Sequence, residues 1–137
     1  MKKTIDVTWS DNMKFSTELD GHKLVLDAAV DNGGSDAGPR PKVLMMVALA
    51  GCTGMDVVSI LAKMRVDLSY FNLKVEGDIN DEHPKKFNSM KVIYEFKGEN
   101  LEYEKLEKAV KLSVEKYCGV NANYKDAMKM DYEIRVL

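Results

Sequence analysis

The sequence predicts an α+β protein whose elements follow one another in the order βββ-α-ββ-α-β. Apolar and polar residues alternate in six segments, which is the period of half-buried strands. A long apolar run from Pro41 to Arg65 indicates one helix, and residues 101–118 carry apolar side chains at helical spacing. Strands at both ends and in the middle, separated by two helices, are typical of an α+β chain.

The first three strands are expected to form an antiparallel meander. The predicted first strand covers Ile5 to Trp9, and the second covers Met13 to Leu19. Asp20-Gly21 is a dipeptide typical of tight hairpin turns. The third strand continues the alternation from Leu24 to Val30.

The central helix follows a loop, residues 31–40, that is dense in Gly, Asp and Pro. Pro41 suits the first helical position. A surface helix normally has an apolar stripe of about 100°, whereas the run from Val43 to Ala50 leaves no polar face. We therefore expect this helix to be buried on several sides. Because Asp56 and Lys63 interrupt the run, it is shorter than the roughly 20 apolar residues of a membrane span, so no membrane partner is expected.

The second half of the chain is predicted to contain a hairpin, a helix and a last strand. Strands at Phe71 to Val75 and Met90 to Phe96 flank a charged connection, Asp78 to Lys86. The second helix, residues 101–118, places four apolar residues on one face: Leu106, Val110, Val114 and Tyr117. Gly119 is the residue type expected just beyond its end. The last strand is expected from Met128 to Val136.

Length and composition indicate a single cytoplasmic domain, residues 1–137. No repeat, low-complexity tract or linker divides the chain. The 20 Lys and Arg against 22 Asp and Glu give a formal charge of -2 without a basic block, so neither nucleic acid nor anionic lipid is an expected partner. The first ten residues lack the apolar core of a signal peptide, which favours the cytoplasm.

The two cysteines, Cys52 and Cys118, lie on the two predicted helices. Two helices on one sheet could bring them within the roughly 7 Å between Cα atoms that a disulfide needs. A cysteine in an apolar helix can equally be a small buried hydrophobe. Gly51 and Gly54 argue against this interpretation, because glycine in a helix interior lowers stability by up to about 1 kcal/mol relative to alanine. Two glycines next to Cys52 indicate that another group approaches closely, and they leave room beside the sulfur.

Four segments resemble the OsmC/Ohr family of osmotically inducible and organic-hydroperoxide-resistance proteins, in particular its OsmC-like members. They are Arg-Pro-x-x-Leu at 40–44, GCTGMDVVSILAKMR at 51–65, EHPKKF at 82–87, and KYC at 116–118 followed by Val120 and Ala122. The resemblance implies an intertwined homodimer of α+β subunits, with two central helices against antiparallel sheets. The long helices would pack back to back, and the active sites would lie at the subunit interface.

The resemblance also implies a thiol-dependent peroxidase acting on organic or lipid hydroperoxides. A thiolate at Cys52 would attack the O–O bond and become a sulfenic acid, and Cys118 would condense with it to an intramolecular disulfide. An external dithiol reductant would then restore both thiols by exchange. No cofactor is implied, and His83 has no metal-ligand spacing to either cysteine.

A peroxidatic thiolate needs a nearby cation, because a free cysteine titrates near 8.5. In the family this cation is an arginine of the N-terminal sheet region, held by a glutamate that follows the proline opening the central helix. Here the first three strands contain no arginine, and Lys42 and Val43 follow the proline. Arg40 is the predicted substitute, with Lys42 able to take part; alternatively, both are solvated residues at a loop–helix junction. Asp56 is expected to pair with a base elsewhere.

Two other functions are compatible with the sequence. The absence of the family arginine and glutamate favours a non-catalytic OsmC-like dimer that is redox-responsive or binds a small ligand. The third hypothesis is a purely structural dimer whose cysteines are inert.

Overall fold

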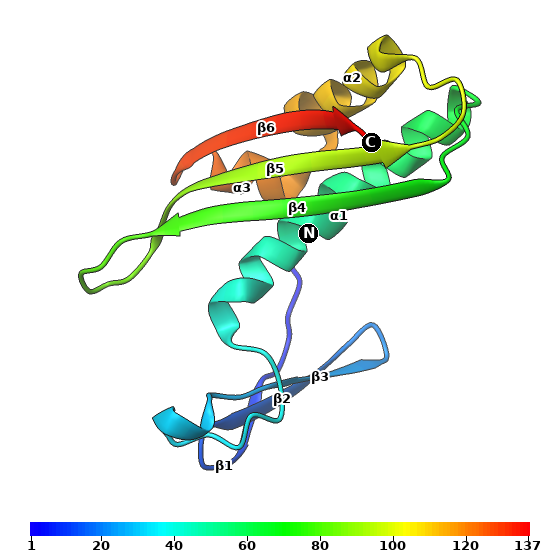
Figure 1. Cartoon of the computed structure of the whole chain (residues 1–137). Coiled ribbons are helices and arrows are strands. Elements are labelled where there is room, and N and C mark those ends of the chain that lie inside the picture. Colours follow the sequence, from blue (N-terminus) through cyan, green and yellow to red (C-terminus); the bar gives the residue numbers. More distant parts are fainter. The chain divides into compact units, whose positions relative to one another are not determined.

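The computed structural model describes residues 1–137 and contains the expected order of strands and long helices (Figure 1). The chain forms two compact units, residues 1–45 and 46–137, and their boundary falls within the long helix α1. The elements are β1 Thr8–Asp11, β2 Lys14–Leu19, β3 His22–Leu26, a 3-10 turn Val30–Asn32, α1 Pro41–Lys63, β4 Tyr70–Ile79, β5 Phe87–Lys97, α2 Tyr103–Leu112, a π-helical turn Ser113–Tyr117, α3 Gly119–Tyr124 and β6 Lys129–Val136.

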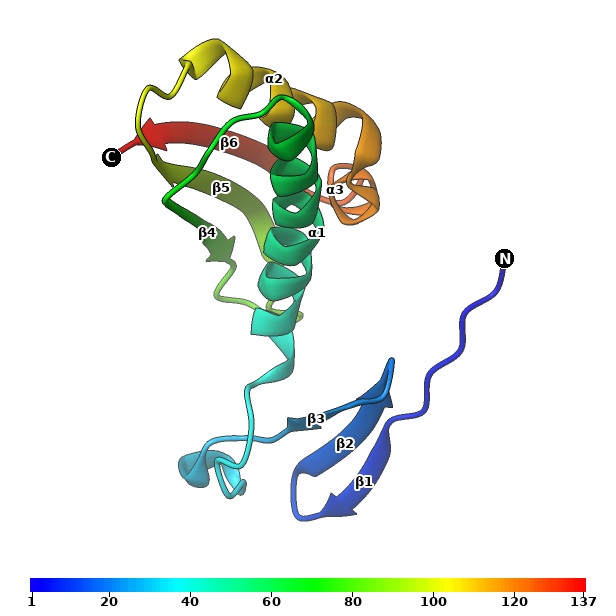
Figure 2. The same ribbon diagram turned by 90° about the vertical axis from the view of Figure 1, so that its right-hand side faces the viewer.

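The first unit contains the predicted antiparallel meander, β1-β2-β3 (Figure 2). Asp20 and Gly21 have φ of 51° and 81°, and they connect the pair Leu19 and His22. These positive φ values are what a two-residue hairpin turn requires. The third strand ends at Leu26, so our prediction that it reaches Val30 is wrong; Val30 lies in the 3-10 turn and is 69% exposed.

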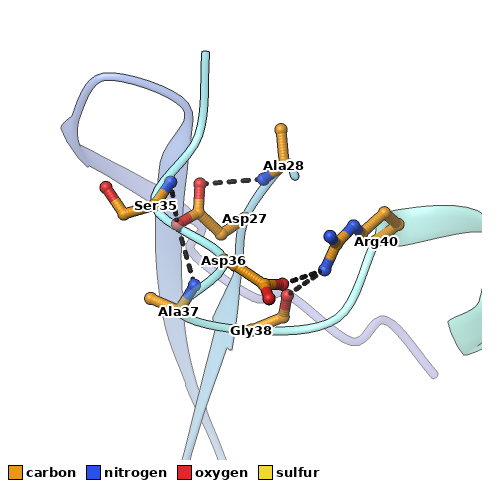
Figure 3. Close-up of polar contacts among 7 residues, drawn as sticks. All are labelled: Asp27, Ala28, Ser35, Asp36, Ala37, Gly38 and Arg40. Carbon is orange, nitrogen blue, oxygen red and sulfur yellow. Dashed lines mark hydrogen bonds and ion pairs between the residues drawn. The ribbon is translucent and has the colours of Figure 1, made fainter. Parts of the chain in front are cut away.

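Asp27 ends the third strand because its side chain bonds the backbone of the loop that follows (Figure 3). This carboxylate is buried and accepts three backbone N–H groups, from Ala28 at 2.8 Å and from Ser35 and Ala37 at 3.1 Å each. These bonds, that of Ala37 first, lower the pKa of Asp27 because they favour its charged form. The loop before α1 is therefore organised around one buried acid.

The second unit is a three-stranded sheet, ordered β4-β5-β6, with helices against it (Figures 1 and 2). Strands β4 and β5 pair antiparallel, as predicted, whereas β5 and β6 pair in parallel. The expectation of purely antiparallel sheets is thus wrong for the last strand. The reason is the connection: α2, the π-helical turn and α3 form a crossover that returns the chain to the same end of the sheet.

The core of this unit lies between the sheet and helices α1 and α2. Strand β5 supplies Met90, Val92, Tyr94 and Phe96, each at most 4% exposed. Helix α1 supplies Leu49, Val57 and Leu61, and helix α2 supplies Leu106, Ala109 and Val110. Since α1 carries part of this core, it is a core helix of the fold, although by length and composition alone it would also qualify as a membrane span.

Only one side of α1 is buried within the chain, which differs from the expected burial on several sides. Its opposite side exposes Val47 by 63%, Met55 by 76% and Val58 by 50%. One sheet and one neighbouring helix cannot cover a helix that is apolar all round. A large apolar helix face is therefore left open in the single chain.

The second predicted helix is interrupted. It ends as α2 at Leu112, makes one π-helical turn from Ser113 to Tyr117, and gives way to α3 at Gly119, so Gly119 begins a helix instead of following one. The wider turn rotates the residues after it relative to the apolar stripe. As a result Tyr117, expected on the apolar face, is 53% exposed. Ser113, the first residue of the turn, continues the buried face of α2 and is fully buried.

Candidate active site around the two cysteines

The structure brings the side chains of Cys52 and Cys118 together. Cys52 is half-buried in the middle of α1, and Cys118 is 3% exposed between the π-helical turn and α3. Burial first, and then the contact with the Cys52 side chain, raise the pKa of the Cys118 thiol to about 11, although the Asn121 backbone N–H partly opposes this. The two thiols are free, interact directly, and occupy unequal environments.

Hydrogen bonds to residues before and after it in the chain hold Cys118 in place. Its backbone N–H donates to the carbonyl of Ser113 at 2.8 Å. Its Sγ accepts the backbone N–H of Asn121 at 3.3 Å, so the sulfur caps the start of α3. The Asn121 side chain in turn donates to the carbonyl of Val114 at 3.1 Å. The position of this thiol is thus fixed by the π-helical turn before it and by α3 after it.

A buried chain of hydroxyl groups runs beside the cysteines. Thr53 Oγ1 lies 2.7 Å from Tyr94 Oη and 2.7 Å from Ser113 Oγ, and Ser113 Oγ donates to Asp56 Oδ2 at 2.9 Å. These three hydroxyl-bearing residues are at most 1% exposed. Asp56, for which we expected a basic partner, instead accepts from a serine. We call Tyr94, Thr53, Ser113 and Asp56 the hydroxyl chain.

The sequence did not reveal the hydroxyl chain. In the sequence, Thr53 is only the residue after Cys52, and Tyr94 is one residue of an alternating strand, so neither indicates a shared site. Ser113 falls three residues after buried Val110, a position that would ordinarily take an apolar residue, and this was the one available signal. Next to the chain, Thr53, Tyr94 and Asn121 help to line a cavity of about 20 Å³. A cavity of this size holds about one water molecule.

The exposed side of α1 forms one wall of an apolar groove of about 670 Å³, within the size range of small-molecule sites. Its lining comes from α1 and β4: Val47, Ala50, Gly51, Gly54, Met55, Val58, Ser59, Phe71, Asn72 and Leu73. Nothing lies within 4 Å of where a Cβ of Gly51 would be. The residue before Cys52 therefore leaves open space, as its glycine suggested.

Arg40, the predicted thiolate activator, belongs to the first unit and the cysteines to the second. Its guanidinium Nη1 donates to Asp36 Oδ1 at 2.5 Å and to the carbonyl of Gly38 at 3.2 Å (Figure 3). The action of Arg40 on Cys52 stays a prediction. No group of three or more His, Cys, Asp or Glu side chains is arranged to hold a metal ion.

Residues 33–133 match a protein-family model described as OsmC-like protein. The chain is 31% identical to protein YhfA of Escherichia coli over 132 residues, which cover 96% of each chain. A crystal structure of a hypothetical protein from Aquifex aeolicus superimposes with a TM-score of 0.83 at 28% identity, covering 100% of this chain and 98% of that one.

Similarity to organic hydroperoxide resistance proteins is more distant. One such structure, so described, comes from Vibrio cholerae and has captopril bound in one of its active sites. It is 21% identical with a TM-score of 0.65, covering 99% of this chain and 92% of that one. At this level of identity the likeness concerns the fold alone.

Proposed function

The chain belongs to the OsmC-like protein family, and from this premise we propose that it is a cytoplasmic, homodimeric thiol peroxidase that reduces organic hydroperoxides. In this proposal residues 1–137 form one OsmC-like domain. Cys52 is the peroxidatic thiol and Cys118 the resolving thiol. The reductant is an external dithiol, and the reaction needs no cofactor.

The unequal environments of two interacting thiols carry this proposal. Cys118 is buried and its pKa is raised to about 11, so it stays protonated at neutral pH and is a poor first nucleophile. Cys52 is more accessible, and the residue before it lines the open groove. Of the two, Cys52 is therefore the one suited to meet a peroxide.

The proposed reaction has three steps. The Cys52 thiolate attacks the distal oxygen of the hydroperoxide, the O–O bond breaks, and the departing alkoxide takes a proton and leaves as an alcohol. Cys118 then attacks the sulfur of the Cys52 sulfenic acid, and its thiol proton leaves with the hydroxide as water. An external dithiol finally reduces the disulfide by thiol–disulfide exchange and is itself oxidised to a disulfide.

The substrate class follows from the groove beside Cys52. Its lining is mostly apolar. In the dimer proposed below, the partner's α1 would cover Val47, Met55 and Val58, so the part left for a substrate is the end next to Gly51. Its apolar surroundings favour hydroperoxides with an organic or lipid tail over hydrogen peroxide. The captopril found in an active site of the Vibrio cholerae protein supports access of a small organic molecule to such a site.

Arg40 is proposed to stabilise the Cys52 thiolate. The family resemblance implies an arginine held by a carboxylate, and here Asp36 holds Arg40 through its guanidinium. An arginine is suited to this role because it stays charged at any physiological pH. In the dimer, this pair would complete the active site at the subunit interface.

The homodimer is supported by the exposed apolar side of α1. A face that exposes Val47, Met55 and Val58 is stabilised when another apolar surface covers it. A second copy of the chain supplies such a surface, with its own α1 packed against the first. An interface of this kind is isologous, because each copy contributes the same patch.

Consumption of cumene hydroperoxide in the presence of dithiothreitol tests the proposed activity. Cys52→Ser is expected to abolish it, because no other thiol meets the peroxide. Without dithiothreitol, Cys118→Ser is expected to consume one equivalent of peroxide and to leave a Cys52 sulfenic acid that a dimedone probe traps. If Cys52→Ser consumes peroxide at the rate of the unaltered protein, the assignment is wrong.

A second candidate is a non-catalytic dimer that is redox-responsive or binds a small ligand. It is favoured by one observation, the absence of an arginine from the first three strands and of a glutamate after Pro41. Alkylation of Cys52 by iodoacetamide across pH distinguishes the two. Fast alkylation that persists below neutral pH, and slows in Arg40→Ala, supports the enzyme; alkylation that is slow at neutral pH supports the binding protein.

A further inference from the structure

We propose that Ser113 is a positioning residue that holds Cys118 beside Cys52 through the hydroxyl chain. The inference rests on the proposed function in one respect, the pairing of these two cysteines as a disulfide. It adds a residue that neither cysteine chemistry nor the family resemblance identifies.

Ser113 bonds to both cysteine-bearing segments at once. Its carbonyl accepts the backbone N–H of Cys118 at 2.8 Å. Its hydroxyl lies 2.7 Å from Thr53 Oγ1 and donates to Asp56 Oδ2 at 2.9 Å. Thr53 directly follows Cys52, and Asp56 lies one helical turn further along α1. One residue therefore ties the backbone of Cys118 to the turn of α1 that carries Cys52.

The directions of the hydrogen bonds follow from the number of protons available. A serine hydroxyl has one proton, and that of Ser113 goes to Asp56, so Ser113 accepts from Thr53. Thr53 has then used its proton and accepts from Tyr94. Each hydroxyl of the chain donates once, and both Thr53 and Ser113 also accept once. The Ser113 side chain is thereby fixed in a single orientation by two partners on α1.

The place of Ser113 at the junction of α2 and the π-helical turn explains why this serine can reach both partners. It lies three residues after Val110 on the buried face of α2, which directs its side chain into the core. Its carbonyl closes the π-helical turn by accepting the Cys118 N–H, five residues later. Ser113 and Thr53 are at most 1% exposed, so bulk solvent does not replace the bond that Thr53 would lose, whereas the half-buried Asp56 can bond to water. Removing the hydroxyl therefore leaves Thr53 and Asp56 each without a partner they now have.

The quantity that Ser113 should control is the effective concentration of one thiol at the other. In the exchange of the protein dithiol with glutathione disulfide, the products are the protein disulfide and two glutathione thiols. When half of the protein carries the disulfide, the ratio [GSH]²/[GSSG] equals the effective concentration of one thiol at the other. This ratio therefore measures how well the protein holds the two sulfurs together. This equilibrium involves no peroxide, so it is independent of the proposed peroxidase activity.

The experiment equilibrates the full-length protein in glutathione buffers and counts the Cys52–Cys118 disulfide by mass spectrometry after alkylation of free thiols. Ser113→Ala is expected to lower the effective concentration roughly tenfold, the effect of losing one typical buried hydrogen bond. Thr53→Val should lower it similarly, since valine keeps the shape and loses the hydroxyl, and Thr53→Ser should restore it to within about twofold. Ser69→Ala, at an exposed serine outside both segments, is the matched control and should leave it unchanged.

A merely structural role gives a different result. It would lower the stability of the reduced and oxidised proteins alike and leave their ratio, and hence the glutathione equilibrium, unaltered. The proposal is overturned if Ser113→Ala stays within twofold of the parent, or if the parent forms no disulfide at any glutathione ratio. Should Ser113→Ala not fold, the comparison of Thr53→Val with Thr53→Ser decides in its place.

The outcome is separable from that of the proposed function. If the glutathione equilibrium shifts as expected while cumene hydroperoxide is not consumed, Ser113 positions the thiols of a protein that is not a peroxidase. If peroxide is consumed and the equilibrium does not respond to Ser113→Ala, the enzyme proposal stands and the positioning role is refuted.

Discussion

Met55 offers the most direct test of the proposed homodimer. It lies on the open side of α1, is 76% exposed, and lines the apolar groove. Replacing it by aspartate removes an apolar side chain from the middle of the proposed interface and adds a charge there. We expect Met55→Asp to dissociate the dimer without unfolding the chain, because this side chain contributes little to the core of its own subunit.

The expected size of the effect follows from the exposure. Full burial of a methionine side chain contributes about 1.5–3 kcal/mol of free energy. Met55 is 76% exposed in the single chain, so an interface that covers it would gain most of this free energy. A symmetric dimer contains the residue twice, so the substitution removes about 2.3–4.6 kcal/mol of association free energy. At about 1.4 kcal/mol for each tenfold change, Kd rises roughly 40- to 2,000-fold. The cost of burying a carboxylate adds to this.

Sedimentation velocity over a range of protein concentrations measures the change. The parent should sediment as a dimer of two 15.4 kDa chains, and Met55→Asp should sediment as a monomer. Tyr103→Asp is the matched control, since Tyr103 is 49% exposed at the start of α2 and does not line the groove. The reasoning fails if Met55→Asp has the Kd of the parent, or if the parent is monomeric at tens of micromolar.

Two further predictions follow from titrating groups. Burial raises the pKa of Cys118 to about 11, well above that of a free cysteine, and this leaves at least roughly 100-fold less thiolate at pH 8. Iodoacetamide should therefore modify Cys118 about that much more slowly in the folded than in the unfolded chain; equal rates would contradict its burial. The pKa of Asp27 is lowered in the folded state, so its contribution to stability is present above the ordinary value of 3.8 and is lost as the pH falls through the folded-state pKa. In urea denaturation between about pH 5 and pH 3, Asp27→Asn should therefore lose less stability than the parent; an identical loss in both proteins would show that Asp27 does not contribute.

The elements that could be read from the sequence are those set by local chemistry. The Asp20-Gly21 turn was predictable because few residues adopt positive φ at both positions. The start of α1 at Pro41 follows from the fixed φ of proline, which suits a first helical residue. Alternating patterns located the strands, since side chains on a strand point to opposite faces in turn.

The features that were missed depend on partners far away in the chain. Thr53 meets Tyr94 across 41 residues and Ser113 across 60, and no local pattern predicts such encounters. The parallel pairing of β6 was missed for the same reason, because it depends on where the crossover returns the chain. The early end of β3 has a local cause, the side chain of Asp27, but the backbone groups it bonds reach as far as Ala37.

The sequence by itself determined the order of the strands and long helices, the apolar character of α1 and the place of Cys52 within it, because these follow from residue type and short-range periodicity. The prediction that Cys118 lies on the second helix is wrong, since Cys118 has an extended backbone between the π-helical turn and α3. Only the tertiary structure decided which side of α1 is covered, that Cys118 is the buried thiol, and that Ser113 joins the two cysteine-bearing segments. The physical reason is that burial and hydrogen-bond partners are properties of the packed chain. They arise when distant residues exclude water from the same place, and the residues taken singly do not carry that information.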